Sequence, residues 1–293
     1  MEWMTVMKET LKYLEENLWN GADTASAADA VHVSPLYLSR GFQILTGFTV
    51  TEYVRSRRLY EAALQIKNTG RKVIDAALDC GYDSPDSFTK AFCRFHGSTP
   101  QQVRAGSGKI HRFQPLRLQI QVTGGDIMDY SIENKDSFQL IGFERTFSEE
   151  SAYREIPGFW DEIREKFCFP AKETDKEQLE VFRRCRIGTW GLCTDGENGN
   201  RIRYMIAGEY SGGPVPQGMK VETVPGGQWA RFRCTGPVPD VLQATNTQIF
   251  REWLPGNPEW EQQGCYTLEW YSANGDPGDA DYESAVWIPV QKK

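Results

Sequence analysis

A repeat of 50 residues constrains the fold of this chain more than any other feature of its sequence. Residues 34–42 (SPLYLSRGF) align with residues 84–92 (SPDSFTKAF), and the match continues downstream to the pairs 47/97 (Gly) and 49/99 (Thr). Similarity over such a window indicates one supersecondary unit that occurs twice. The first third of the chain is therefore expected to consist of two related modules.

Each module is expected to contain two short helices joined by a tight turn. In the first copy, a helix over 26–31 is followed by a turn and by a second helix that begins at 34–35, where serine can cap the helix and proline suits its first position. The second copy repeats this order with a helix over 73–80 and a start signal at 84–85. Small alanines in the first helix of each copy let two helices cross closely, as in a helix-turn-helix unit.

The segment between the two copies, 50–67, has the apolar periodicity of one amphipathic helix. This connector is expected to place one set of side chains inward and three arginines outward. The inward set is Tyr53, Leu59, Ala63 and Ile66, and the outward set is Arg55, Arg57 and Arg58. A plain tandem of helical hairpins would show the same apolar pattern, so the pattern alone does not establish a function.

These motifs closely resemble the DNA-binding region of AraC/XylS transcription regulators. The resemblance rests on V-S-P-x-Y-L-S-R-x-F, the connector, and G-Y-D-S-P-x-S-F-T-K-A-F, and it covers about residues 8–106. It implies an all-α domain with two helix-turn-helix units at opposite ends of the connector helix. The second helix of each unit would then enter one of two successive major grooves on one face of the duplex.

The resemblance also implies which side chains meet DNA. The first reading helix would present Leu36, Ser39 and Arg40 to base edges, and the second would present Pro85, Asp86, Thr89 and Lys90. Arg40 is the strongest candidate, because a guanidinium can bind both major-groove acceptors of guanine, whereas Asp86 repels phosphate. The candidate phosphate contacts, which position the protein without reading sequence, are Arg55, Arg57, Arg58, Arg71, Lys72, Arg94 and Arg104.

Charge and cysteine usage narrow the classes of partner. Residues 1–117 carry a net charge of +3 and residues 118–293 a net charge of −10, so an anionic polymer is expected to prefer the first part. The seven cysteines are scattered without a Cys-x-x-Cys pair, and we expect neither a disulfide framework nor a metal site. No signal peptide or membrane span is apparent, and we expect a cytoplasmic protein without a cofactor.

The second part of the chain is expected to be an α+β domain with one antiparallel sheet and helices on one face. Its elements follow the order strand, helix, strand, strand twice, which indicates a duplicated unit. The predicted strands are 130–147, 184–194, 201–211, 219–236, 265–272 and 282–291, and the predicted helices are 151–167 and 238–254.

Aromatic residues are concentrated in this acidic part, which holds seven of the nine tryptophans. Alternation along 266–271 puts Glu269 on the same strand face as Thr267 and Tyr271, opposite Leu268 and Trp270. Many aromatics can fill a core, and they can also line a pocket for flat apolar ligands.

This part resembles the GyrI-like effector-binding domain over about residues 127–291. The resemblance rests on the duplicated topology and on the segments RYMIAGEY, VPGGQWARFRCTGPV and LEWY. It implies a pocket in which Glu269 binds lipophilic cations. The candidate pocket residues beside Glu269 are Trp160, Trp190, Tyr204, Trp229, Tyr271 and Trp287.

Together these features predict a transcription regulator with three segments. Residues 1–108 would bind promoter DNA, 109–126 would be a linker, and 127–293 would bind a small effector. RNA polymerase is a further candidate partner. Two alternatives for the second domain stay open, a protein-interaction module and a small-molecule hydrolase, although the sequence contains no Ser-His-Asp, Cys-His, zinc or phosphate-loop signature.

Overall fold

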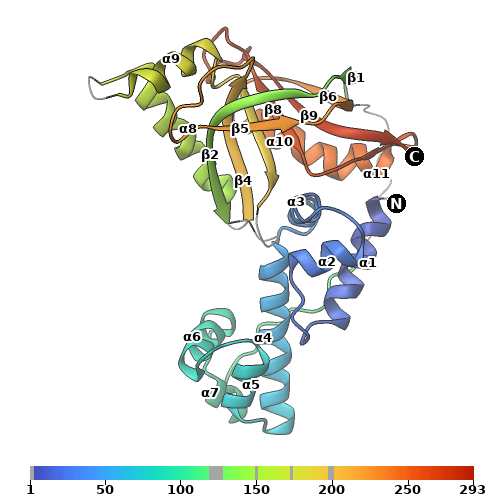
Figure 1. The fold of residues 1–293 in the computed structure, drawn as a ribbon. Helices are drawn as coiled ribbons and strands as arrows, with labels where there is room; N and C mark the ends of the chain where they lie inside the picture. The colour runs from blue at the N-terminus through green and yellow to red at the C-terminus, as the bar shows by residue number, and fades with distance from the viewer. Residues whose placement is uncertain (1–2, 119–127, 149–150, 172–173, 197–200) are drawn as a thin grey trace.

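The computed structural model describes residues 3–118, 128–148, 151–171, 174–196 and 201–293. A helical part leads into a curved antiparallel sheet flanked by further helices (Figure 1). The helices of the first part are α1 (Trp3–Glu16), α2 (Thr24–Ala30), α3 (Pro35–Thr46), α4 (Val50–Thr69), α5 (Val73–Asp79), α6 (Pro85–His96) and α7 (Pro100–Arg104). Within the described ranges, no helix is both long and apolar enough to cross a bilayer.

The helix boundaries in the repeat follow the capping signals of the sequence. The side chain of Asp23 accepts a hydrogen bond from the Ser26 amide and caps α2, and the serines at 34 and 84 cap α3 and α6 in the same way. Proline occupies the first turn of both α3 and α6. The expected helix pairs α2–α3 and α5–α6 are therefore present, each with its turn.

The repeated Gly-x-Thr motif marks the same boundary between two helices in both copies. Gly47 and Gly97 end α3 and α6 in the left-handed conformation, with φ of 78° and 69°, which a residue without Cβ adopts at little cost. Two residues later, Thr49 and Thr99 cap the next helices, α4 and α7. In both copies, therefore, the glycine terminates one helix and the threonine caps the next.

The connector helix α4 is present, but two of its three arginines do not point outward. The expected inward residues are buried and Arg55 is exposed. Arg57, however, is buried, with its side chain only 5% exposed, and it pairs with Glu15 of α1 and with Glu61 at 2.9 Å each. Arg58 is half-buried and donates from Nε to the Leu18 carbonyl at 2.6 Å. The outward assignment of these two residues was wrong, because α1 covers this side of α4.

The first half of the predicted linker lies against the helical part. Arg57 donates to the Phe113 carbonyl at 2.8 Å, and the Leu116 amide donates to the Tyr53 hydroxyl at 3.4 Å. The Phe113 ring packs at 5.3 Å from that of Phe48. Residues 109–118 thus extend along the helices, while the rest of the predicted linker, up to 126, lies outside the described residues.

The second part contains a nine-stranded sheet whose strand pairs are all antiparallel. Its order is β1-β6-β9-β8-β3-β4-β2-β5, and β7 pairs with β9. The strands are β1 (Tyr130–Lys135), β2 (Phe138–Ser148), β3 (Trp190–Asp195), β4 (Arg201–Glu209), β5 (Lys220–Val224), β6 (Gly227–Thr235), β7 (Trp260–Gln262), β8 (Thr267–Tyr271) and β9 (Glu283–Lys292). The helices are α8 (Ala152–Cys168), α9 (Lys176–Arg184), α10 (Asp240–Gln248), the π-helical turn η2 (Ile249–Trp253) and α11 (Leu254–Gly256).

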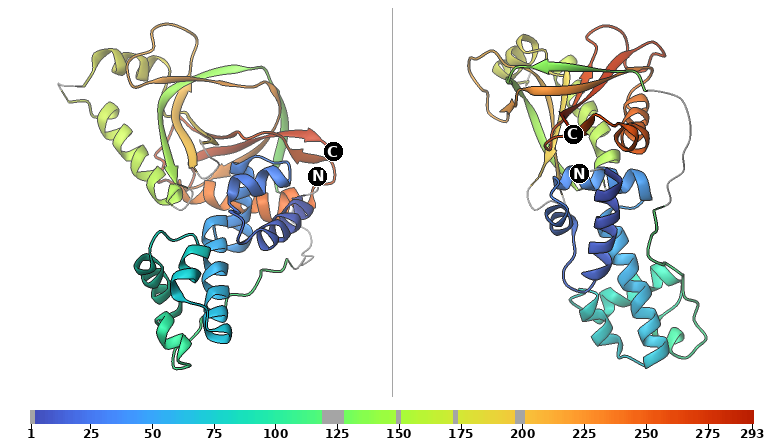
Figure 2. Two further views of the ribbon diagram at one scale, coloured as in Figure 1. Left: turned by 60° about the horizontal axis from the view of Figure 1, so that its bottom comes forward. Right: turned by 90° about the vertical axis from the view of Figure 1, so that its right-hand side faces the viewer.

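Two strands that the sequence predicts as continuous are each interrupted. The stretch predicted over 130–147 breaks between β1 and β2, and that over 219–236 breaks between β5 and β6. Residue 135 pairs with 227 in the β1–β6 ladder, and residue 138 pairs with 224 in the β2–β5 ladder. The pairing register therefore continues from one ladder into the other across both breaks. The sheet therefore curves so far that its two ends meet along one ladder (Figure 2). Helix α9 and strand β7 were not predicted.

The two faces of the sheet carry different groups of side chains. One face packs against α8 through Phe143 and Ile206 and against the segment from α10 to α11 through Phe232 and Val286. The other face holds a separate apolar cluster that includes Leu192, Met205, Leu268 and several tryptophans. The expectation of helices on one face agrees with these contacts.

The helical part packs against the sheet domain through a shared core. The Trp3 indole donates to the Phe250 carbonyl at 3.1 Å, and the rings of Trp3, Tyr37 and Phe250 lie 4.7 to 5.7 Å apart. Gly41 permits this approach, because a Cβ there would overlap the Trp3 ring. Helix α3 is thereby held next to the sheet domain, whereas α5, α6 and α7 extend away from it (Figures 1 and 2).

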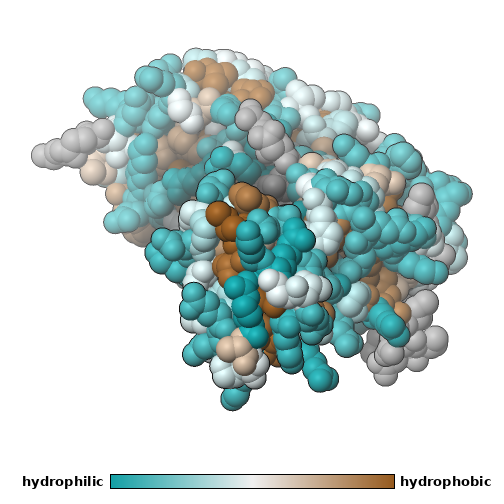
Figure 3. All heavy atoms as spheres, turned by 90° about the horizontal axis from the view of Figure 1, so that it is seen from below, coloured by the Kyte–Doolittle hydropathy of each residue, from teal (hydrophilic) through white to brown (hydrophobic). Residues whose placement is uncertain are grey.

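Seen from the end that carries α5 to α7, the surface is mostly hydrophilic with a narrow apolar strip (Figure 3). Ile74 and Leu78 of α5 are among the exposed large apolar side chains of the helical part, with exposures of 51% and 64%. Pro85, Asp86 and Lys90 of α6 are also exposed.

Candidate functional site

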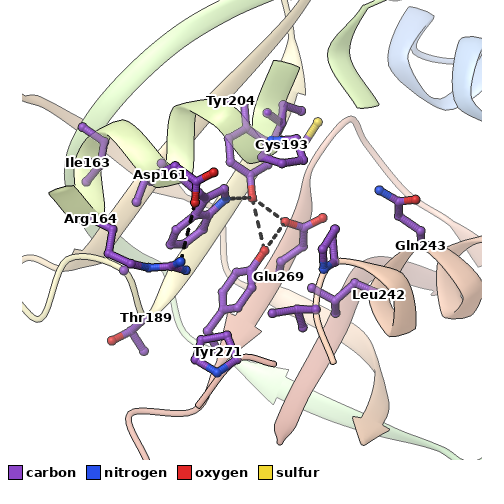
Figure 4. A pocket seen from close by; sticks show the side chains of 18 of the residues that line it. Asp161, Ile163, Arg164, Thr189, Cys193, Tyr204, Leu242, Gln243, Glu269 and Tyr271 are labelled. Carbon is purple, nitrogen blue, oxygen red and sulfur yellow. Dashed lines mark hydrogen bonds and ion pairs between the residues drawn. The ribbon is translucent and has the colours of Figure 1, made fainter. Parts of the chain in front are cut away.

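A cavity of about 820 Å³ lies on the face of the sheet that α8 and α10 cover. Figure 4 shows its interior from close by. The sheet supplies its floor, α8 and α10 supply two walls, and α3 of the helical part supplies a third. The residues central to its chemistry are Ser39, Arg40 and Gln43 of α3, Tyr153 and Trp160 of α8, Cys193 of β3, Tyr204 of β4, Leu242 of α10, and Glu269 and Tyr271 of β8.

Glu269 stands at the floor of this cavity and is held by two phenols (Figure 4). Its Oε2 accepts hydrogen bonds from the Tyr204 hydroxyl and, at 2.9 Å, from the Tyr271 hydroxyl. Trp160 donates from Nε1 to the Tyr204 oxygen at 3.1 Å, and its ring lies 4.7 Å from that of Tyr271. No described residue donates a hydrogen bond to Oε1 of Glu269. One carboxylate oxygen is thus fixed, and the other has no hydrogen-bond partner among the described residues.

The two phenols remain hydrogen-bond donors at neutral pH. Burial raises the pKa of Tyr204 well above its usual value, and the charge of Glu269 raises it further. The same causes, in the same order, raise the pKa of Tyr271. Since neither phenol ionises near neutral pH, both hydroxyls stay available to donate hydrogen bonds to the Glu269 side chain.

Gly191 of β3 lies opposite Glu269 in the ladder between β3 and β8 and makes the close packing of this network feasible. A Cβ at this position would lie 2.3 Å from the Tyr204 hydroxyl and 2.9 Å from Glu269 Oε2. The sequence pattern did not single out this glycine. Its signal is visible only when the strand register is known.

We expect Gly191→Ala to displace Tyr204 and Glu269 and to destabilise the fold by about 1 to 3 kcal/mol, as overpacking typically does. Thermal unfolding of the full chain measures this. Gly158→Ala is the matched control, because Gly158 lies within α8, where an added Cβ would meet no heavy atom within 4 Å. An equal melting temperature for Gly191→Ala and the unsubstituted chain would contradict the packing role of Gly191.

Three of the six predicted aromatic neighbours of Glu269 do not line the cavity. Trp160, Tyr204 and Tyr271 do so, as expected. Trp190, Trp229 and Trp287 instead belong to the apolar cluster on the opposite face of the sheet. The cause is the strand alternation, because Trp190 pairs with Trp270 and Gly191 with Glu269. The prediction that these three tryptophans form pocket walls was wrong.

Arg40 reaches the same cavity from α3. Its Nη2 lies 3.3 Å from the Cys193 sulfur, and its Nη1 is buried without a hydrogen-bond partner among the described residues. Burial acts to lower the pKa of Arg40, but the net shift is upward, and Glu269 is among the groups that raise it. Burial also raises the pKa of the Cys193 thiol to about 11, so it stays protonated. The residue expected to read DNA is therefore a charged part of the pocket.

The other predicted DNA-contacting residues divide between the two helix pairs. In α3, Leu36 and Ser39 are buried against the sheet domain, and Arg40 beside them is half-buried. In α6, Pro85, Asp86 and Lys90 are exposed and Thr89 is half-buried. Of the candidate phosphate contacts, those that are exposed are Arg55, Lys72, Arg94 and Arg104. Arg57 is ion-paired inside the helical part, as described above.

The cysteines and acidic residues show no further site. Each of the seven cysteines has a free thiol. Across the described ranges, no group of three or more His, Cys, Asp or Glu side chains is arranged to hold a metal ion.

Both parts of the chain match models of known protein families. A helix-turn-helix domain model matches residues 27–106, and the model of the integron-associated effector binding protein matches residues 131–290, more than half of the chain. The chain belongs to the AraC/XylS-type transcription regulators that carry an effector-binding domain. It therefore combines a DNA-binding helical domain with an effector-binding domain.

Curated relatives of this regulator are themselves transcription regulators. SoxS of Salmonella typhimurium is 31% identical over 104 residues, which are 36% of this chain and 97% of SoxS. Rob of the same organism is 27% identical over 171 residues, 57% of this chain and 56% of Rob, so the regulator spans about half the length of Rob. AarP of Providencia stuartii is 34% identical over 100 residues, 34% of this chain and 74% of AarP.

Solved structures similar to the regulator cover just over half of the chain at low identity. SAV2435 bound to tetraphenylphosphonium is 21% identical, with a TM-score of 0.45 over 56% of this chain and 94% of that chain. An integron cassette protein from the mobile metagenome of Vibrio cholerae is 15% identical, with a TM-score of 0.38 over 55% of this chain and 95% of that chain.

Proposed function

We propose that the regulator senses a lipophilic cation in the cavity around Glu269 and couples its binding to promoter recognition. The observation that carries this proposal is the carboxylate of Glu269, which is oriented by two phenols at the floor of a cavity of about 820 Å³ and keeps one oxygen unpaired among the described residues. A cavity of this size accommodates a drug-sized molecule.

The chemistry of the lining favours a cation over a neutral or anionic ligand. A positive group placed against Oε1 of Glu269 gains a charge-assisted hydrogen bond or ion pair. The rings of Trp160 and Tyr271, 4.7 Å apart, can add about 0.5 to 2 kcal/mol of attraction for a cation. An anion would meet the fixed carboxylate, and a neutral ligand would gain only apolar contact.

The helical part supports double-groove recognition of DNA. We infer that α2–α3 and α5–α6 act as two helix-turn-helix units, one at each end of α4. A 20-residue helix is about 30 Å long, close to the roughly 34 Å between successive major grooves on one face of a duplex. Leu36, Ser39 and Arg40 would read bases from one unit, and Pro85, Asp86, Thr89 and Lys90 from the other.

The sheet domain supports an internal duplication. The sets β2-α8-β3-β4 and β6-α10-β8-β9 have the same order of elements, and the sheet order places β2-β4-β3 and β6-β9-β8 as mirrored halves joined at β3 and β8. We propose domain limits at 1–108 and 127–293, action in the cytoplasm, and RNA polymerase as a candidate partner on promoter DNA.

Calorimetric titration of the full chain tests the cation-binding proposal. Tetraphenylphosphonium and tetraphenylborate have nearly the same shape and opposite charge. We expect the phosphonium to bind and to quench tryptophan fluorescence, and the borate not to bind. Trp160→Phe should remove most of the quenching, because Trp160 lines the cavity and Trp190, Trp229 and Trp287 lie on the opposite face of the sheet. Equal binding of both ions, or of neither, would reject a cation sensor in favour of a neutral-ligand pocket or an interaction module.

A further inference from the structure

The effector cavity is built from both domains, because the reading helix α3 forms one of its walls. Ser39, Arg40 and Gln43 line the cavity together with Glu269 and Cys193 of the sheet domain. A ligand in this cavity therefore meets the same helix face that is proposed to meet DNA. The cavity and the first reading helix cannot be treated as separate sites.

Contacts at both ends fix α3 in this position. At its start, the Leu36 amide donates to Oδ1 of Asp195. At its end, Arg251 of η2 donates to the Ile44 carbonyl at 2.9 and 3.1 Å. The Leu36 side chain, 4% exposed, is part of the core formed by β2, β4 and α8. Since a recognition helix contacts bases with its N-terminal residues, α3 in this position cannot enter a major groove.

The sheet domain offers α3 groups of the kind that DNA would offer. The carboxylate of Asp195 accepts from an amide in the first turn of α3, where a helix N-terminus favours an anion such as a phosphate. The guanidinium of Arg40 lies in a cavity with Glu269 instead of against a guanine. In the described part of the chain, the second reading helix, α6, has no such cover, and Lys90, the repeat counterpart of Arg40, is exposed.

The guanidinium of Arg40 is poorly paired when α3 lies in this position. No described carboxylate lies within ion-pair distance of its guanidinium, and its buried Nη1 has no hydrogen-bond partner among the same residues. A half-buried guanidinium that has no paired carboxylate and whose buried nitrogen makes no hydrogen bond is costly. The charge of Glu269, which is not in direct contact, stabilises the Arg40 guanidinium.

We propose that Arg40 is an internal cation that occupies the effector cavity, and that a cationic effector displaces it and releases α3 for DNA. This inference rests on the proposed cation-binding function and assigns its regulation. A second positive charge in the cavity neutralises Glu269 and repels Arg40, which has no paired carboxylate among the described residues there. Helix α3 then detaches, and its base-reading face becomes accessible.

Thermodynamic linkage makes the coupling reciprocal. If a cation raises the affinity of the chain for DNA by some factor, DNA raises the affinity for the cation by the same factor. A substitution that weakens the packing of α3 on the sheet domain must also raise the affinity for DNA and the affinity for the cation. The contacts of Asp195 and Arg251 with the backbone of α3 provide that route without altering a base-reading side chain.

The first experiment removes the internal cation. Calorimetry of full-length Arg40→Met should show tetraphenylphosphonium binding about tenfold tighter than to the unsubstituted chain, because the repulsion between two cations in one cavity is gone. Lys67→Met, which removes an exposed positive charge at the end of α4, is the matched control and should not change binding. Unchanged or weaker binding to Arg40→Met, with the fold intact by thermal unfolding, would overturn the competition.

The second experiment follows α3 directly by hydrogen exchange in the full chain. Saturating tetraphenylphosphonium should speed amide exchange in residues 35–46 and leave residues 85–96 unchanged as the internal control. Arg251→Ala and Asp195→Asn should speed exchange in α3 without ligand and should raise the affinity for a DNA fragment selected by the phosphonium-saturated chain.

The results separate the two proposals. If the phosphonium binds but neither α3 exchange nor DNA affinity changes, the displacement of Arg40 is wrong and the cation site stands. If the phosphonium does not bind, the cation site is wrong. In that case, faster α3 exchange and higher DNA affinity in Arg251→Ala and Asp195→Asn still support masking of α3, and their absence overturns it.

Discussion

Glu269→Gln is expected to weaken the binding of tetraphenylphosphonium to the full chain by about 2 to 3 kcal/mol, or roughly 30- to 150-fold. Glutamine keeps the shape of the side chain and removes the charge that faces the ligand. The remaining Tyr204 and Tyr271 hydroxyls, which donate to Glu269, would then point at an amide and offer no compensation to a cation. Isothermal titration calorimetry measures the change.

The control for this prediction is Glu283→Gln on the neighbouring strand β9, since Glu283 is exposed and does not line the cavity. It should leave phosphonium binding unchanged. Triphenylphosphine oxide, a neutral analogue, should lose far less affinity than the phosphonium between the unsubstituted chain and Glu269→Gln. Equal losses for the charged and the neutral ligand would show that Glu269 shapes the pocket without acting through its charge.

Arg40→Ala in residues 1–108 is expected to weaken binding to selected DNA by about 1 to 3 kcal/mol and to relax the preference at one base pair. Removing the sheet domain also removes the cover of α3, so this fragment reports base reading without the competition in the cavity. Mobility shifts against a set of single-base variants measure the preference.

Arg94→Ala in the same fragment is the contrasting variant, because Arg94 is an exposed candidate phosphate contact on α6. It should weaken all sequences alike and reduce the salt dependence of binding by about one phosphate contact. Asp86 and Pro85 make α6 the poorer reader, so the α3 half-site should carry most of the specificity. Equal information in two half-sites, or no change with Arg40→Ala, would refute this assignment.

Local signals in the sequence predicted the two repeated helix pairs and the connector helix. Capping residues, the proline in the first turn of α3 and α6, and the left-handed glycines at 47 and 97 act over a few residues and need no distant partner. The strand alternation around Glu269 is equally local, and it correctly placed Glu269 and Tyr271 on one face. Each of these features therefore follows from a short stretch of residues and their neighbours in the chain.

The sequence by itself determined the repeated helix pairs, the connector, the antiparallel sheet and the carboxylate in an aromatic strand. Only the tertiary structure decided which face of the sheet Trp190, Trp229 and Trp287 occupy, because that depends on the register between strands far apart in the chain. It also decided that α1 covers Arg57 and that the sheet domain covers Arg40. The sequence pattern of a helix is the same whether an arginine stays at the surface or is covered by another part of the chain. Only long-range packing determines which of the two occurs.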